Sequence, residues 1–138
     1  MFGSGSILTY MAKKGAPELY PEDPIRRIAV DNWFYWGTST FTPLAQQFGH
    51  YTIRSPEKVP AAQKHYEAVL LDMLGTINKQ LDGQDYLAGD YSIADISCYP
   101  DIHIHGVDDI GLGDFPNVSR WHDAIAARPA VQRAWEKF

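Results

Sequence analysis

The chain has 138 residues, which fits a single domain. Hydrophobic residues make up 45% and charged residues 21% of it, an ordinary globular composition that argues against disorder. Seventeen acidic residues against twelve Lys and Arg give a net charge of −5, whereas nucleic-acid binders normally present a basic face. The single cysteine rules out an internal disulfide and favours a reducing, cytoplasmic location. No apolar run approaches the ~20 residues that cross a bilayer, so we expect neither a membrane nor a nucleic-acid partner.

Helical periodicity dominates the chain, because apolar residues recur every three or four positions and almost nowhere alternate. We therefore predict an all-α bundle of five to six helices. The first helix covers residues 6–15, and Gly15 ends it after two lysines that suit the negative end of the helix dipole. Asp23-Pro24 opens the second helix as an N-cap followed by proline. Gly37 is expected to weaken this helix, and Pro43 to kink or end it.

The clearest amphipathic helix carries apolar residues from Tyr66 to Leu81 at steps of four, four, three and four. Two start signals precede it, at Ser55 and, one turn later, at Pro60. Asp82-Gly83 is expected to end it, since this pair favours a turn.

A capping box marks the start of the next helix. The Ser92 side chain can bind the backbone amide of Asp95, while the Asp95 carboxylate reaches back to the start of the helix. Further along, Pro116-Asn117 opens another helix, and Arg128-Pro129 separates it from a short closing helix over residues 131–135.

Two groups of reactive side chains have plain structural interpretations. Cys98 lies beyond the first turn of its helix and lacks a cationic neighbour in sequence, so a small buried hydrophobe is favoured over a nucleophile. His103 and His105 point about 200° apart on a helix and cannot share one ion there. We therefore predict no metal site, and we interpret this segment as a polar loop after Pro100.

The glycine-rich opening Gly3-Ser4-Gly5-Ser6 lacks the lysine and the spacing of a phosphate-binding loop. It is better interpreted as the N-terminus of the first helix. The free amides there and the Ser4 hydroxyl are suited to holding a carboxylate.

Four consecutive aromatic residues, 33–36, must face all around a helix. Core packing can absorb two of them, so the others are expected to line a hydrophobic pocket or an interface, the alternative being core packing alone. His50 and His65 are candidate ligands for a substrate carboxylate, or else solvated surface residues.

Several stretches resemble, in order and spacing, the helical C-terminal domain of the glutathione transferase family over residues 16–138. They are Tyr86-Leu87-Ala88-Gly89, Tyr91-Ser92-Ile93-Ala94-Asp95-Ile96, Tyr99-Pro100, Phe115-Pro116-Asn117-Val118, Arg120-Trp121 and Ala127-Arg128-Pro129-Ala130-Val131. The aromatic run and the Phe48-Gly49-His50-Tyr51 segment are similar to the bacterial disulfide-reducing, yeast prion-related branch. Residues 1–15 resemble the last helix of the family's thioredoxin-like domain, most of which this sequence lacks.

The resemblance implies roles for individual residues. Ser4 would help to hold the γ-glutamyl end of glutathione, although Gly3 stands where the family usually has Glu. His65 stands where the disulfide-reducing branch usually has an Arg that contacts a second glutathione. Ser92 and Asp95 would be structural, and no residue is assigned a catalytic or metal-binding role. The residues proposed for the substrate pocket are Trp33, Trp36, His50 and His65.

The resemblance also implies what the parent protein does. It would conjugate glutathione, its co-substrate, to a small hydrophobic electrophile, or use glutathione to reduce a disulfide. The thioredoxin-like part would supply the group that stabilises the thiolate, so we expect little or no activity from this chain alone and leave its standing as an enzyme open. The alternative is a non-catalytic protein-interaction or scaffold module of the same fold. We also expect a homodimer, because the first helix would otherwise lack a cover for its apolar face.

Overall fold

The computed structural model describes residues 2–137 and, among them, the side chains outside residues 106–109. The helices are α1 (Ser4–Gly15), η1 (Pro17–Leu19), α2 (Pro24–Trp36), η2 (Gly37–Phe41), α3 (Thr42–Gly49), η3 (His50–Arg54), α4 (Pro60–Gln80), α5 (Ile93–Asp101), η4 (Ile102–Ile110), α6 (Pro116–Ala126) and α7 (Pro129–Trp135). The only extended pairing in the described residues is two isolated bridges within residues 86–90. The predicted all-α fold is confirmed. None of the described helices is both long and apolar enough to cross a membrane.

Three π-helical segments lengthen the α-helices, since η2 joins α2 to α3, η3 extends α3 and η4 extends α5. Helical backbone runs without a break from Pro24 to Arg54 and again from Ile93 to Ile110. With α1, α4, α6 and the short α7 this makes six helical segments of more than three residues in the described part of the chain, within the five to six that the sequence predicted.

Of the two outcomes expected at Pro43, a kink or an end of the second helix, the end does not occur. The π-helical segment η2 precedes this proline, and the Thr42 amide donates to the Gly37 carbonyl five residues back. Proline normally breaks an α-helix because it lacks an N–H and its ring collides with the carbonyl four residues back. The wider π turn shifts the backbone hydrogen-bond pattern from four to five residues back just before the proline, so the helix continues.

The polar loop expected after Pro100 is also wrong, because η4 follows α5 directly. His103 and His105 therefore lie on helical backbone. His105 is buried and His103 is half-buried, since residues two positions apart on helical backbone face different neighbours.

The longest helix, α4, begins at Pro60 rather than at Ser55, and Leu81 forms its C-cap. Gly83 has a φ of 70° in the turn that follows, a conformation that favours glycine. The core side of α4 is formed by Leu70, Met73, Leu74 and Ile77. The predicted extent of this helix is thus correct once the later of its two start signals is taken.

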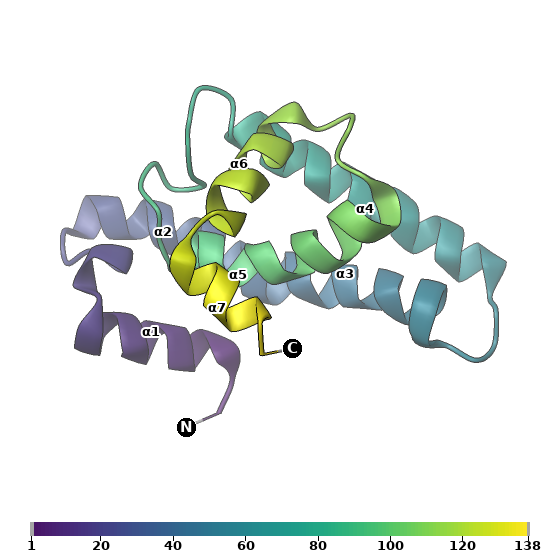
Figure 1. Ribbon diagram of the computed structural model, residues 1–138, viewed down its shortest axis with the longest axis horizontal. Coiled ribbons are helices and arrows are strands. Elements are labelled where there is room, and N and C mark those ends of the chain that lie inside the picture. The colour runs from purple at the N-terminus through teal and green to yellow at the C-terminus, as the bar shows by residue number, and fades with distance from the viewer. Residues whose placement is uncertain (1, 138) are drawn as a thin grey trace.

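The helices pack around α5, which lies against α2 and α3, while α4 packs on α3 and on α6 (Figure 1). Figure 1 shows α1 at one edge of the bundle, below α2. Ala12 anchors α1 in the core, whereas Ile7, Tyr10 and Met11 remain 43%, 46% and 59% exposed. The apolar face of α1 is therefore only partly covered by the bundle.

The predicted capping box of α5 is present, and it forms the polar centre of the fold. Asp95 is fully buried, and its Oδ2 accepts the Ser92 amide at 2.9 Å. Its Oδ1 accepts the Leu87 amide at 2.9 Å and the Trp121 indole N–H at 2.8 Å. One carboxylate thus joins the start of α5 to the preceding loop and to α6. Burial raises the pKa of Asp95, and the hydrogen bonds that it accepts oppose this shift.

Candidate functional site

The N-terminus of α1 is open. Gly3, with a φ of 83°, leads into the helix, and no side chain caps it. The Ile7 amide, which donates to the Gly3 carbonyl, makes the first intrahelical bond. The first turn carries no acidic residue, so the positive end of the helix dipole has no counter-charge on α1 itself. Ser4, the first residue of α1, is exposed at this end. The predicted position of Ser4 at a helix N-terminus is therefore correct.

A cleft of about 610 Å³ adjoins this end of α1 and separates it from α2. Tyr10, Tyr35 and Lys13 are among its polar lining residues, and the Lys13 ammonium lies 5.5 Å from the centre of the Tyr20 ring. The two helices come close at Gly5, where an added Cβ would lie 3.4 Å from the Phe34 ring. The cleft is lined by Gly3, Gly5, Ser6, Thr9, Tyr10, Lys13, Phe34, Tyr35 and Thr38. Amide donors, hydroxyls and one ammonium group suit a small molecule that carries a carboxylate.

The aromatic run on α2 divides as a helix requires. Phe34 is buried in the core, while Tyr35 is 61% exposed beside the cleft. Trp33 and Trp36 are half-buried and meet edge to face, with ring centroids 5.3 Å apart. Trp36 also stacks on Phe41 at 5.5 Å. Part of the run is therefore core and part remains on the surface.

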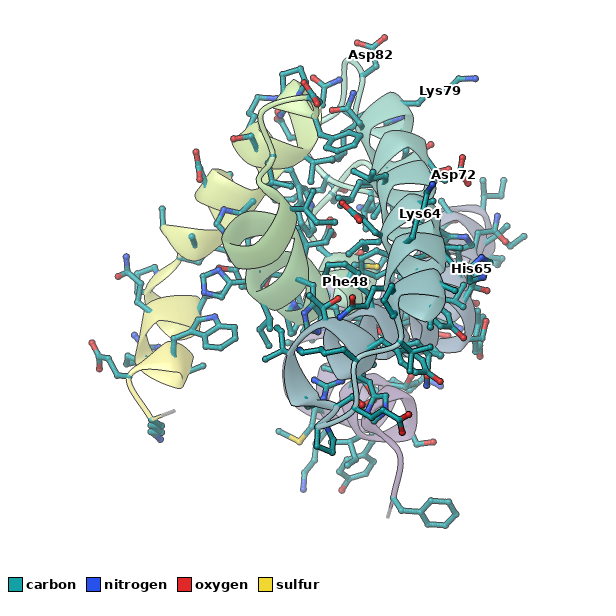
Figure 2. The ribbon with its side chains drawn as sticks, turned by 90° about the vertical axis from the view of Figure 1, so that its right-hand side faces the viewer. Phe48, Lys64, His65, Asp72, Lys79 and Asp82 are labelled. Carbon is teal, nitrogen blue, oxygen red and sulfur yellow. The ribbon has the colours of Figure 1, made fainter. Side chains whose placement is uncertain are left out.

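His50 and His65 are both exposed, each beside a tyrosine. The His50 ring lies 5.0 Å from Tyr51, and the His65 ring lies 5.1 Å from Tyr66. The two tyrosines stack on one another at 5.4 Å with planes 7° apart. Figure 2 shows His65 on the outer side of α4. The four aromatic rings tie η3 to the first half of α4.

The four proposed pocket residues do not form one pocket but lie as two separate pairs. Trp33 and Trp36 form one pair on α2. His50 and His65 are linked through the tyrosine stack. Since Trp36 and His50 are fourteen positions apart on one continuous helix, the two pairs lie about 20 Å apart along it at 1.5 Å per residue.

Sequence reasoning missed Tyr10, Lys13 and Tyr35 as residues that line the cleft beside α1. Tyr10 and Lys13 are three positions apart and share one face of α1, a signal that the sequence does contain. The approach of Tyr35 depends on how α1 packs on α2, which no local pattern gives.

The described residues hold no evident group for activating a thiol. Burial raises the pKa of the Cys98 thiol to about 12, and the side chain is fully buried, which confirms the interpretation as a small hydrophobe. Among the described residues no group of three or more His, Cys, Asp or Glu is arranged to hold a metal ion. The site geometry is that of a ligand-binding cleft next to an open helix end.

Comparison with known proteins assigns the family. The model of the glutathione S-transferase C-terminal domain matches residues 40–129. The disulfide-bond oxidoreductase YfcG of Escherichia coli (strain K12) is 33% identical over 135 residues, 97% of this chain and 62% of that protein. The protein URE2 of Eremothecium gossypii is 26% identical over 175 residues, 97% of this chain and 49% of that protein.

A solved structure agrees with these relatives. The glutathione transferase BgramDRAFT_1843 of Burkholderia graminis, crystallised with two glutathione molecules per subunit, matches with a TM-score of 0.89 at 32% identity, covering 96% of this chain and 58% of that one. The chain thus spans about half to three-fifths of the length of the relatives it matches. The 138-residue chain belongs to the glutathione transferase family and has the fold of that family's C-terminal helical domain.

Proposed function

We propose that this chain is the helical domain of a glutathione-dependent enzyme that conjugates glutathione to electrophiles or reduces disulfides with it. The observation that carries the proposal is the open N-terminus of α1, with Ser4 exposed there beside a cleft that Lys13 also lines. Glutathione carries two carboxylates, and amide donors at a helix N-terminus together with an ammonium group recognise carboxylates. The disulfide-bond oxidoreductase and the glutathione-bound transferase among the relatives support the same substrate class.

The chain by itself is proposed to turn over glutathione slowly or not at all. A free thiol titrates near pH 8.5, and lowering its pKa by two units needs about 2.7 kcal/mol of stabilisation of the thiolate. A donor next to the sulfur normally provides this. We assign no described residue to that role, so we place the thiolate-stabilising group in a thioredoxin-like domain of the parent protein.

We propose that the second substrate contacts the surface aromatic and histidine residues. The Trp33–Trp36 pair offers an apolar edge, and the pair His50 and His65 offers imidazoles beside stacked tyrosines. Their separation means that one small electrophile contacts one pair at a time. A larger disulfide substrate has the length to reach both.

A scaffold or interaction module of the same fold is the alternative, and one observation favours it. A cavity of about 720 Å³ between α5 and α7 has an almost wholly apolar lining that includes Ile104, Val131 and Trp135. Protein surfaces with large apolar patches commonly contact other proteins. A homodimer in a reducing cytoplasm is the quaternary state and location that we propose under either function.

Glutathione binding tests the proposal directly. The chain is passed over immobilised glutathione, and its affinity is measured by calorimetry with reduced glutathione. We expect Lys13→Gln to weaken binding about tenfold, because a hydrogen bond to a charged group contributes about 1.5 kcal/mol. Lys79→Gln, an equally exposed lysine on α4 (Figure 2), is the matched control and should bind as the wild type does. A chain that flows through the column and shows no heat of binding would favour the scaffold.

A conjugation assay with an aryl halide tests the second part. The thiolate sulfur would attack the ring carbon, and the halide would leave with the bonding electron pair. We expect turnover close to the uncatalysed rate. Fast turnover by the chain alone would contradict the proposal that it has no thiolate-stabilising group. It would leave the proposal that the chain binds glutathione untouched.

A further inference from the structure

Two histidines from different helices form a direct bond outside the proposed glutathione cleft. His103 Nδ1 on η4 lies 2.9 Å from His122 Nε2 on α6. The ring planes are 9° apart and the centroids 5.2 Å apart. The centroid separation exceeds the nitrogen separation by about the width of one imidazole ring, so the rings lie end to end in one plane. One nitrogen therefore points its hydrogen straight at the lone pair of the other.

The groups around this bond fix which nitrogen donates. The Asp123 carboxylate lies 3.1 Å from His122 Nδ1, which assigns the hydrogen of neutral His122 to that nitrogen. His122 Nε2 then accepts the Nδ1 hydrogen of His103. Asp123 is exposed, while His122 is 8% exposed, so the bond is sheltered from water.

Each helix packed against the pair presents a defined group. From α5, the Tyr99 ring lies 5.6 Å from His103 and 5.3 Å from His122. Burial raises the pKa of Tyr99, so its hydroxyl stays neutral in acid and at neutral pH. From α6, Arg120 lies two residues before His122, and its guanidinium is bonded to the carbonyls of Leu81 and Gln84.

The short helix α7 covers this junction. The Trp135 ring lies 4.5 Å from the His103 ring. No residue of α7 is fully buried, and no side chain caps its N-terminus. Val131 and Trp135 also pack against the core, and the Trp135 side chain is hydrogen-bonded to Tyr99. Just before the helix, the Arg128 guanidinium lies 3.7 Å above the Tyr91 ring. Trp135 and Ala134 also form one wall of the apolar cavity.

We propose that the His103–His122 bond is an acid-sensitive latch that holds α7 in place as one wall of the apolar cavity. One added proton is tolerated, because an imidazolium donating to a neutral imidazole beside the Asp123 carboxylate is a strong, charge-assisted hydrogen bond. A second proton leaves two N–H groups facing each other with like charges and no lone pair between them. The bond then breaks, and Trp135 loses the ring on which it packs.

The opening of the latch depends on the protonation of His103 and His122 together and not of either one alone. An isolated imidazole titrates near pH 6.5, and the first proton on a coupled pair opposes the second. The latch therefore holds while the pair carries at most one added proton, and it opens in acid when the second proton binds. When it opens, α7 moves away, and the apolar cavity loses the wall that Ala134 and Trp135 form.

Tryptophan indole N–H resonances report the opening. The chain has four tryptophans, and Trp135→Phe identifies the signal of Trp135. Between pH 7.5 and pH 5 we expect the Trp135 signal to shift while the signal of Trp121, in the core, stays in place. We also expect the amide protection of residues 129–137, corrected for intrinsic exchange, to fall about tenfold.

Two substitutions separate a latch from simple packing. In His122→Gln the side-chain oxygen accepts the Nδ1 hydrogen of His103 in both protonation states, so the acid shift should disappear while α7 stays ordered. His65→Gln removes an exposed histidine on α4 and should keep the wild-type transition. An acid shift that persists in His122→Gln overturns the proposal. So does an unchanged Trp135 signal down to pH 5, or a shift of all four indoles together, which means global unfolding.

Discussion

Removing the charge of Asp95 tests whether its carboxylate holds the fold together. Oδ1 accepts the Leu87 amide and the Trp121 indole, and Oδ2 accepts the Ser92 amide. In Asp95→Ala these three buried donors lose their acceptor, at about 1–3 kcal/mol each. The sum of about 3–9 kcal/mol is comparable to the whole stability of a domain, about 5–15 kcal/mol. We expect this variant to unfold or to be barely folded.

Asp95→Asn is the measurable version of the same change. The amide oxygen can replace Oδ1, but the amide nitrogen then faces the Ser92 N–H, and that one donor loses its acceptor. Because burial raises the pKa of Asp95, asparagine also removes part of the cost of burying a charge. The expected loss is therefore about 2 kcal/mol, which lowers the urea midpoint by about 1 M for an m-value near 2 kcal/mol/M.

The assay is equilibrium unfolding in urea, followed by far-UV circular dichroism. Asp72→Asn is the control, because Asp72 is exposed on α4 (Figure 2) and should change the free energy of unfolding by less than about 0.5 kcal/mol. A loss below about 0.5 kcal/mol in Asp95→Asn, equal to that of the control, would refute the reasoning that the carboxylate serves three buried donors.

Three further predictions follow from the burial of side chains and from the close approach of neighbouring helices. Burial raises the pKa of Asp101, so the folded state keeps this proton to higher pH than the unfolded chain does. The stability that the protonated group contributes in acid is therefore lost as pH rises through the raised pKa. In urea unfolding from pH 4 to 7, the free energy of unfolding of Asp101→Asn should increase relative to that of the wild type as pH rises. The buried Cys98 thiol should react with a disulfide reagent only when the chain unfolds, so native labelling at the rate of a free thiol would contradict its burial. Gly49→Ala places a Cβ 2.3 Å from His105 and should cost about 1–3 kcal/mol, whereas Gly75→Ala meets nothing within 4 Å and should stabilise α4 by about 0.5–1 kcal/mol in thermal unfolding.

Local signals were enough to place most helix boundaries. The N-cap at Asp23, whose side chain accepts the Arg26 amide, and the capping box at Ser92 both form as the sequence predicts. Each depends on side chains bonding to backbone within one turn, so tertiary packing does not need to be known. The same holds for Gly83, which ends the long helix at a positive φ. The errors occurred at prolines inside helices, where the outcome depends on the turn before or after the proline.

The site was predicted less completely than the fold. Ser4 could be placed because a helix N-terminus is a local feature. The cleft beside it could not, since Tyr35 reaches it from α2, and how α2 packs on α1 is not a local feature. The aromatic run showed that some rings must remain outside the core, but not which ones. Likewise His103 and His122 are nineteen residues apart, and no spacing rule joins them.

Two glycines explain why α5 and η4 can lie so close to the long helical segment from Pro24 to Arg54. A Cβ at Gly37 would come within 2.7 Å of the Cys98 sulfur, and a Cβ at Gly49 within 2.3 Å of the His105 ring. Gly37, the earlier glycine, meets Cys98, and Gly49, the later one, meets His105 further along the other segment, so the two helical segments run in the same direction. Gly37 therefore allows the two helical segments to pack closely, although in the sequence a glycine at this position indicates a weak helix. The cost of glycine in a helix, about 0.5–1 kcal/mol, is offset here by burial of side chains that a larger residue would displace.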